Sequence, residues 1–341
     1  MTSLSLSQPA SALDEQFNAS DAELILRSSD GVDFAVYRAI LQLASHVFRD
    51  MLSLPPPVED HDSPTRTTIG MSEDAQSLRL LLHFTYPRSF CPEPDLSEIA
   101  DIKRVAALAL KYDITFMREA AETALIRFAQ SKPDVAYVVA WRFEYPQALR
   151  AAARRSLEPF TESLDALEFS EVPASALQTL RKYGKRISVQ ITLISMQLRY
   201  GNFRRLHCHG MSGVLHAAFS DDDPSGLREP CRCRSSTVAL VDETLSTEDD
   251  ISVRAPAWWA NYVRVVAKSA SNSLRERHKL LLSESLSEPL ASVLREAAKC
   301  AGCMQRDVRH KLEVTKTILS KEIERRVSQV PIEAPFMRED E

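Results

Sequence analysis

Glycine is scarce in this chain, with eight residues among 341, whereas proline is plentiful at 18. Sandwiches and barrels are rich in glycine turns, so this composition favours helices that end at prolines. Apolar residues make up 44% and charged residues 26%, a balance typical of a soluble globular protein. The length is sufficient for two domains of ordinary size, and we expect a helix-rich chain with real apolar cores.

Long apolar runs are also missing. Residues 1–20 hold no run of about seven apolar residues, which predicts the absence of a secretory signal peptide. No stretch reaches the roughly 18 apolar residues of a membrane helix. We therefore expect a cytoplasmic or nuclear protein without membrane contact. In those compartments the six cysteines are expected to be thiols or metal ligands rather than disulfides.

The net charge of −5 is small and unevenly distributed. Residues 1–130 hold 19 acidic and 11 basic side chains, whereas the remainder holds 28 acidic and 31 basic ones. Neither part therefore has the strong positive field of a non-specific nucleic-acid binder.

Short catalytic motifs are absent. The sequence contains no phosphate-binding Gly-x-x-x-x-Gly-Lys, no Gly-x-Gly-x-x-Gly, no Gly-x-Ser-x-Gly and no His-Glu-x-x-His. No set of nucleophile, base and orienting group can be named from the residues either. We therefore expect a protein that is not an enzyme, with no catalytic and no cofactor-binding residues.

The N-terminal third of the chain predicts a small α+β unit. Asp30-Gly31 lies between two β-type runs, 23–28 and 32–37, and supplies the positive φ that a tight hairpin needs. Helical periodicity follows at 38–44 and again after Ser45, a candidate N-cap. Further elements are expected in this order: a strand at 67–71, a helix from Ser72 to Pro87, a helix from Ser97 to Tyr112, and a helix over 116–130.

Four sequence blocks of this unit match the pattern of one family. They read Phe34-Ala-Val-Tyr37-Arg38-Ala-Ile40-Leu41, Ser45-His-Val47-Phe48-Arg49-Asp-Met51, Leu81-Leu-His-Phe84-Thr-Tyr86 and Ala106-Ala-Leu-Ala-Leu-Lys111-Tyr112. The region resembles a BTB/POZ domain, and its sequence is similar to that of the expanded fungal group of this family. The residues that carry the resemblance are Asp21, Phe34, Tyr37, Arg38, Leu41, Ser45, Phe48, Met51 and Tyr86.

The resemblance implies a non-catalytic interaction module or adaptor whose partners are other proteins. Association with a second copy through this domain, giving a homodimer, is one form of that function. A substrate adaptor of a cullin ubiquitin ligase is an alternative, although the hydrophobic-x-Glu element of cullin-binding members is replaced here by prolines and Val58-Glu59. The family's His-Lys pair is also replaced, by Tyr37-Arg38.

The expected domains are a flexible N-terminus at 1–19, the BTB/POZ domain at 20–130, a mostly α-helical region at 131–330 and a tail at 331–341. Gly184 and several prolines are expected to interrupt the helices of residues 134–200. Residues 187–198 fit strand as well as helix periodicity, and helix is preferred. Segments 220–236 and 242–256 are expected as exposed loops. Three more helices are expected near 258–270, 290–299 and 309–327.

Cysteine and histidine cluster in the C-terminal part, as His207-Cys208-His209, Cys231-Arg-Cys233 and Cys300-Ala-Gly-Cys303. Thiolates from short pairs can complete a tetrahedral zinc site, so one hypothesis is a structural zinc held by Cys231, Cys233, Cys300 and Cys303, with Cys208 as a substitute ligand. The other interpretation is that these are scattered thiols, because the spacings match no common zinc finger.

Residues 181–210 are basic and contain no acidic residue, with Tyr183, Tyr200 and Phe203 among the charges. This mixture could contact nucleic acid, which makes a nucleic-acid-associated regulator a second alternative. The interpretation that we favour is a solvated helical face whose cations pair with acidic segments of the same protein.

Overall fold

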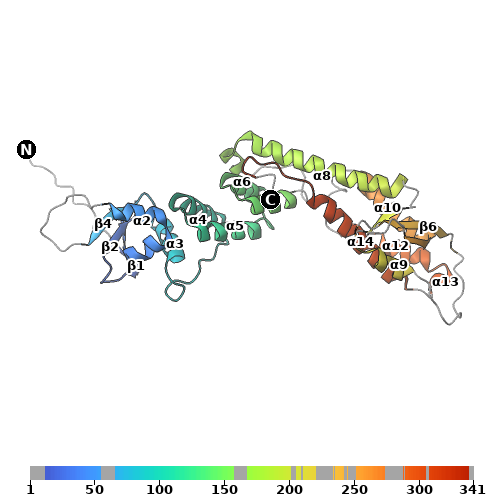
Figure 1. The fold of residues 1–341 in the computed structure, drawn as a ribbon, viewed down its shortest axis with the longest axis horizontal. Coiled ribbons are helices and arrows are strands. Elements are labelled where there is room, and N and C mark those ends of the chain that lie inside the picture. The colour runs from blue at the N-terminus through green and yellow to red at the C-terminus, as the bar shows by residue number, and fades with distance from the viewer. Residues whose placement is uncertain are drawn as a thin grey trace, which may run out of the picture. The chain divides into compact units, whose positions relative to one another are not determined.

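The computed structural model describes residues 12–54, 66–156, 167–200, 205–208, 210–219, 233, 235–241, 244, 251–272, 287, 289–304 and 307–337. The chain forms two compact units, residues 1–152 and 153–341. The first is an α+β unit with a small sheet, and the second is mostly helical (Figure 1). This confirms the predicted fold class.

The sheet of the first unit is built around the predicted hairpin. Strands β2 (Leu24–Arg27) and β3 (Val32–Val36) pair antiparallel, and Gly31 in the turn has a φ of +88°. Strand β4 (Thr67–Gly70) pairs parallel with β2, and strand β1 (Ala12–Asn18) pairs parallel with β3. The strand order is therefore β1-β3-β2-β4. The hairpin and the strand near 67–71 are therefore confirmed.

Helices that pack on one another make up the rest of this unit. They are α1 (Arg38–Ala44), α2 (His46–Ser53), α3 (Ala75–Thr85), α4 (Ile99–Tyr112), α5 (Thr115–Phe128), α6 (Pro133–Arg142) and α7 (Pro146–Arg155). Ser45 caps α2, because its hydroxyl accepts the backbone N–H of Phe48 at 3.2 Å. Helix α3 begins later than predicted, since Asp74 and not Ser72 accepts the capping N–H, that of Ser77.

Strand β1 corrects the expected N-terminal boundary. Residues 12–18 belong to the sheet, so the predicted flexible N-terminus is wrong for them. Asp14 is buried on this strand and accepts local hydrogen bonds from the backbone N–H groups of Gln16 (3.0 Å) and Phe17 (3.1 Å). Arg79 on α3 adds an ion pair, with 2.5 Å between its Nη2 and Asp14 Oδ2.

The second unit contains elements that the sequence predicted and others that it did not. The predicted helices are present as α8 (Ala174–Tyr200), α10 (Ala257–Asn272), α12 (Leu290–Ala297) and α14 (Val308–Ser328). Shorter elements are a 3-10 helix at Leu167–Glu171, α9 (Ser212–Phe219) and α13 (Ala301–Met304). A three-stranded sheet is formed by β5 (Arg205–His207), β6 (Ser235–Val241) and β7 (Ile251–Pro256), in that order.

Three expectations for this unit are corrected. Gly184 does not interrupt α8, where it is buried in a continuous helix. Strands β6 and β7 replace parts of the two expected loops, because they pair antiparallel and the cross-strand partners Val238 and Val253 are both buried. Residues 331–337 of the expected tail pack onto the unit, since Ile332 and Ala334 are buried and Glu333 forms an ion pair with Arg186 at 2.6 Å.

Among the helices that the structure describes, none is both long and apolar enough to cross a membrane.

The buried carboxylate on β1 generates a stability prediction. Burial by itself would raise the pKa of Asp14, but hydrogen bonds from Phe17, Arg79 and Gln16 hold it below its usual value. Asp14 therefore stabilises the fold at neutral pH, and this contribution is lost as the pH falls through its folded pKa. We expect Asp14→Asn to lower the free energy of unfolding by about 2 kcal/mol at neutral pH.

Thermal unfolding from neutral pH to about pH 2 measures this effect, and the difference between wild type and Asp14→Asn should shrink with acid. The matched control is Glu15→Gln, because Glu15 is the next residue of the same strand and is exposed. It should change stability by no more than about 0.5 kcal/mol. Equal losses for the two variants would contradict the role of Asp14.

Candidate functional site

The predicted signature residues form the junction between β3 and α1. The hydroxyl of Tyr86 accepts the backbone N–H of Tyr37 at 3.0 Å, at the residue where the strand gives way to the helix. The hydroxyl of Tyr37 in turn donates to Asp21 at 2.8 Å. A phenol thus makes a hydrogen bond to the signature aspartate from the position that carries histidine in the family pattern.

Arg38 ties the first helix pair together. Its guanidinium donates from Nη1 to the backbone carbonyl of Leu52 at 2.7 Å, and its backbone N–H donates to Glu23 at 2.8 Å. Arg38 therefore links the start of α1 both to the end of α2 and to the residue that precedes β2.

Ser45 and Phe48 connect this pair to α4. The Ser45 hydroxyl donates to the backbone carbonyl of Tyr112 at 2.5 Å, and the Phe48 ring stacks on the Tyr112 ring with 4.5 Å between centroids. Tyr112 also donates to Glu73 at 2.9 Å. Of the remaining signature residues, Phe34 and Leu41 are fully buried and Met51 is half-buried. The signature residues therefore make hydrogen bonds and packing contacts that hold this unit together.

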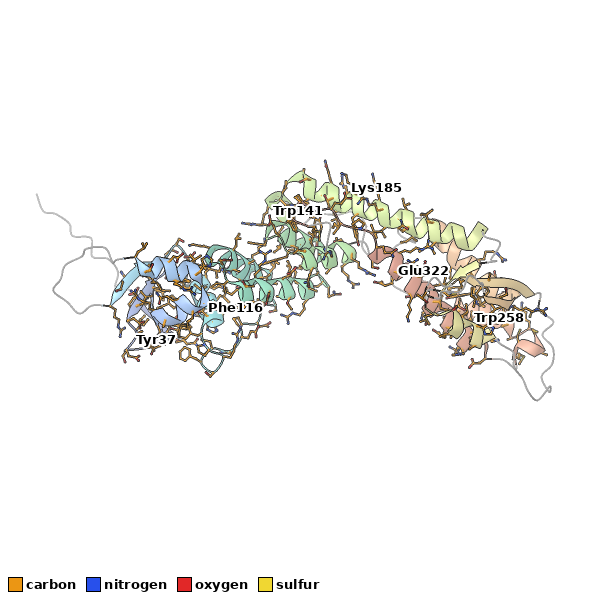
Figure 2. The ribbon with its side chains drawn as sticks, viewed as in Figure 1. Tyr37, Phe116, Trp141, Lys185, Trp258 and Glu322 are labelled. Atoms are coloured by element: carbon orange, nitrogen blue, oxygen red, sulfur yellow. The ribbon has the colours of Figure 1, made fainter. Side chains whose placement is uncertain are left out.

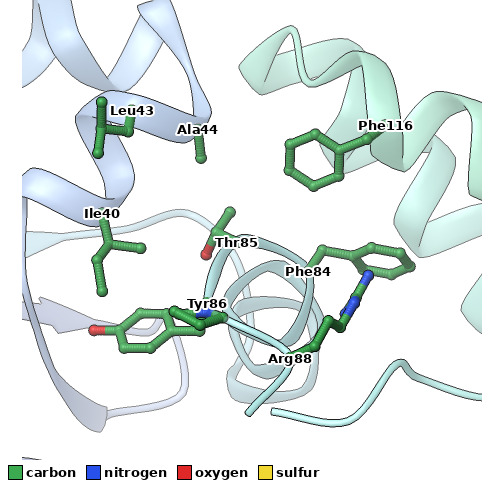
Figure 3. Close-up of a pocket in the computed structure, with 9 residues that line it drawn as sticks. Ile40, Leu43, Ala44, Phe84, Thr85, Tyr86, Arg88 and Phe116 are labelled. Atoms are coloured by element: carbon green, nitrogen blue, oxygen red, sulfur yellow. The ribbon is translucent and has the colours of Figure 1, made fainter. Parts of the chain in front are cut away.

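Beside this junction an apolar groove is open at the surface (Figure 3). Its volume is about 460 Å³. Three segments line it: the C-terminal part of α1, the end of α3 with the residues that follow it, and the start of α5. The lining residues are Ile40, Leu43, Ala44, Phe84, Thr85, Tyr86, Pro87, Arg88 and Phe116.

The two sides of the groove expose large apolar side chains. Leu43 on α1 is 83% exposed and Phe116 on α5 is 41% exposed. Figure 3 shows Leu43 and Ala44 on one side and Phe116 on the other, with Thr85 between them. Tyr86 and Phe84 are buried beneath, so the groove has a fixed floor and two accessible apolar sides.

Arg88 is the charged residue of the lining. Its guanidinium lies over the Phe84 ring, 5.7 Å from the centroid, and donates from Nη1 to the backbone carbonyl of His83 at 3.1 Å. Its Nη2 is 3.9 Å from a carboxylate oxygen of Glu93. Burial raises the pKa of Tyr86 to about 12, so its hydroxyl stays neutral at physiological pH. This lining offers apolar contact with one cation at its edge.

The sequence did not single out this groove. Leu43 and Phe116 are apolar residues in amphipathic segments, and such residues are normally assigned to the core. A signal was nevertheless present, because Leu43 is two positions from buried Leu41 and so falls on a different face of the same helix.

The structure brings together three of the five predicted metal ligands. The sulfur atoms of Cys233, Cys300 and Cys303 all lie within 4.8 Å of one another. Cys208 is buried elsewhere, with its thiol 3.2 Å from the backbone carbonyl of Leu206. Cys231 lies outside the described residues, as does Val58-Glu59 of the predicted cullin element.

Two residues of the basic segment contact other parts of their own unit. Tyr183 is buried, and Arg186 pairs with Glu333. A hydrogen bond from Arg186, together with the positive charges of Arg186 and Lys182, lowers the pKa of Glu333. Pairing of these cations with acidic residues of the same protein is the behaviour that the favoured interpretation expects. Tyr200, Phe203 and Arg204 are not among the residues whose side chains are described.

Comparison with known proteins identifies the N-terminal part of the chain. The family model for the BTB/POZ domain matches residues 13–129, which begins within β1 and ends just after α5. No curated protein matches the chain. The comparison names the domain and not a subgroup, so the resemblance to the fungal group stays a prediction.

The hydroxyl of Tyr86 generates a testable prediction. Tyr86→Phe keeps the ring of the groove floor but removes the acceptor of the Tyr37 N–H, and we expect a loss of about 1 kcal/mol in the free energy of unfolding. Tyr37→Phe is the control, because the Tyr37–Asp21 bond is exposed and should contribute less than about 0.5 kcal/mol. Thermal unfolding and hydrogen exchange of peptides across the β3–α1 junction measure the effect of each variant. A larger loss of stability in Tyr37→Phe than in Tyr86→Phe would refute the role given to the Tyr86 hydroxyl.

Proposed function

We propose that this chain, whose residues 13–129 form a BTB/POZ domain, is a non-catalytic interaction protein that binds a different protein through the groove above Tyr86. BTB/POZ domains are protein–protein interaction modules. The observation that carries the finer proposal is the exposure of Leu43 and Phe116 on the two sides of an apolar groove.

The groove suits apolar side chains of a partner. Burying a leucine or phenylalanine side chain contributes roughly 1.5–3 kcal/mol, so Leu43 and Phe116 together can supply most of the affinity of a small interface. An amphipathic helix presents such side chains in a row, which fits a groove between α1 and α5. The edges of the sheet are less suitable, because β4 has four residues and the pairing of β1 is irregular.

Charge favours a partner other than a second copy. Residues 1–130 carry 19 acidic and 11 basic side chains, and two such domains repel each other at long range. A partner with a basic surface is attracted to this domain and associates faster at low ionic strength. We therefore assign the groove to a helix with apolar anchors and a net positive charge.

A photo-crosslinking amino acid at position 43 tests the occupant of the groove in cells that express the full chain. We expect an adduct with a different, basic protein. The control places the same amino acid at Leu110, which is 68% exposed on α4 but does not line the groove. An adduct with a second copy of the chain, or the same adducts from both positions, would contradict the proposal.

The binding constant of the crosslinked partner, once purified, provides the quantitative test. Leu43→Asp and Phe116→Asp should each weaken binding by about tenfold or more, because each buries a charge in an apolar contact. Leu110→Asp should change it by less than about twofold. If Leu110→Asp weakens binding as much as Leu43→Asp, the groove is not the interface.

A further inference from the structure

Three cysteines far apart in the sequence meet in the second unit. Cys233 lies two residues before β6, whereas Cys300 directly precedes α13 and Cys303 lies within it. Their sulfur atoms are all within 4.8 Å of one another, and those of Cys233 and Cys303 are 3.6 Å apart. None of the described cysteines is in a disulfide. The fold has therefore collected three thiols at one point.

The spacing of the sulfur atoms agrees with metal coordination. A Zn–S bond is about 2.3 Å long, so tetrahedral geometry places two coordinating sulfurs about 3.8 Å apart. The 3.6 Å between Cys233 and Cys303 is close to this value, whereas a disulfide would require about 2.05 Å. Three thiols at such distances also exceed what one disulfide can use.

The surroundings of the cluster suit thiolates. Trp258, at the start of α10, donates its indole N–H to the sulfur of Cys303 at 3.2 Å, and both residues are buried. A donor aimed at a sulfur stabilises its negative charge and orients it, as the outer partners of metal ligands do. Figure 2 shows Trp258 in the part of the second unit that contains β6 and α12.

The turn at Cys300 also has the geometry of a two-ligand turn. The backbone N–H groups of Cys303 and Met304 both donate to the carbonyl of Cys300, at 3.0 and 2.9 Å. This closes the Cys-Ala-Gly-Cys segment tightly and turns both sulfurs to one side. Structural zinc sites commonly combine two ligands from one short Cys-x-x-Cys segment with others from a distant part of the chain.

We propose that Cys233, Cys300 and Cys303 bind a zinc ion that links the residue segment just before β6 to α13. They fill three of the four positions of a tetrahedral ion. Cys231, the fourth ligand that the sequence predicted, lies outside the described residues. The site is separate from the BTB/POZ domain and from the groove. Binding releases the thiol protons, and because zinc holds the folded state together, it stabilises the second unit.

The zinc content of the reduced full-length protein tests the site. We expect about one equivalent of zinc in the wild type and less than about 0.2 in Cys233→Ser and Cys300→Ser, because each removes one thiolate ligand. These two residues are chosen because they are only half-buried. The matched control is Cys208→Ala, a cysteine of the same unit outside the cluster, which should keep the full equivalent.

Cobalt substitution and a chelator give readouts that do not depend on zinc content alone. Cobalt bound by the wild type should show thiolate-to-metal charge transfer, absent from Cys300→Ser. A strong chelator should lower the thermal midpoint of the wild type and leave that of Cys300→Ser unchanged. Less than about 0.1 equivalent of zinc in the wild type, or the same content in Cys300→Ser, would overturn the proposal.

Discussion

The hydroxyl of Tyr86 is the contact on which both the N-terminal fold and its groove depend. It accepts the backbone N–H at the point where β3 ends and α1 begins, and so fixes the direction in which α1 leaves the sheet. The ring of the same residue forms the floor of the groove. Because α1 carries Leu43, the position of one side of the groove follows from a hydrogen bond beneath it. The same residue therefore serves both the fold of this unit and the floor of the groove.

Two neighbouring tryptophans play a comparable role in the second unit. Trp258 donates to the Cys303 sulfur, whereas Trp259 donates at 2.8 Å to the hydroxyl of Thr315 on α14. Adjacent residues of a helix project in different directions, so this pair joins the cysteine cluster and the long C-terminal helix through the first turn of α10. Both rings are buried, and both polar groups are satisfied.

Local signals were sufficient for much of the fold. Asp30-Gly31 identified the hairpin and Ser45 the cap of α2, because both act within a few residues of their own position. Strand β1 was missed because its buried residues, Asp14 and Phe17, do not alternate, and because Asp14 is stabilised by Arg79 from a distant helix. Similarly, the exposure of Leu43 depends on neighbours that no local pattern specifies. The cysteines were found by type, but what collects Cys233 and Cys303 is tertiary packing, because β6 and α12 both contact α10.

Strand β1 matters for how this domain can be separated from the rest of the chain. Phe17 on β1 is buried against Phe34, with 6.2 Å between ring centroids, and lies 5.2 Å from the ring of Tyr86. A fragment that began at residue 20, where the sequence pattern alone suggests the domain starts, would leave these two rings uncovered. Such a fragment would expose β3 as an unpaired apolar edge strand. Its self-association would then result from the chosen fragment boundary rather than from a property of the protein.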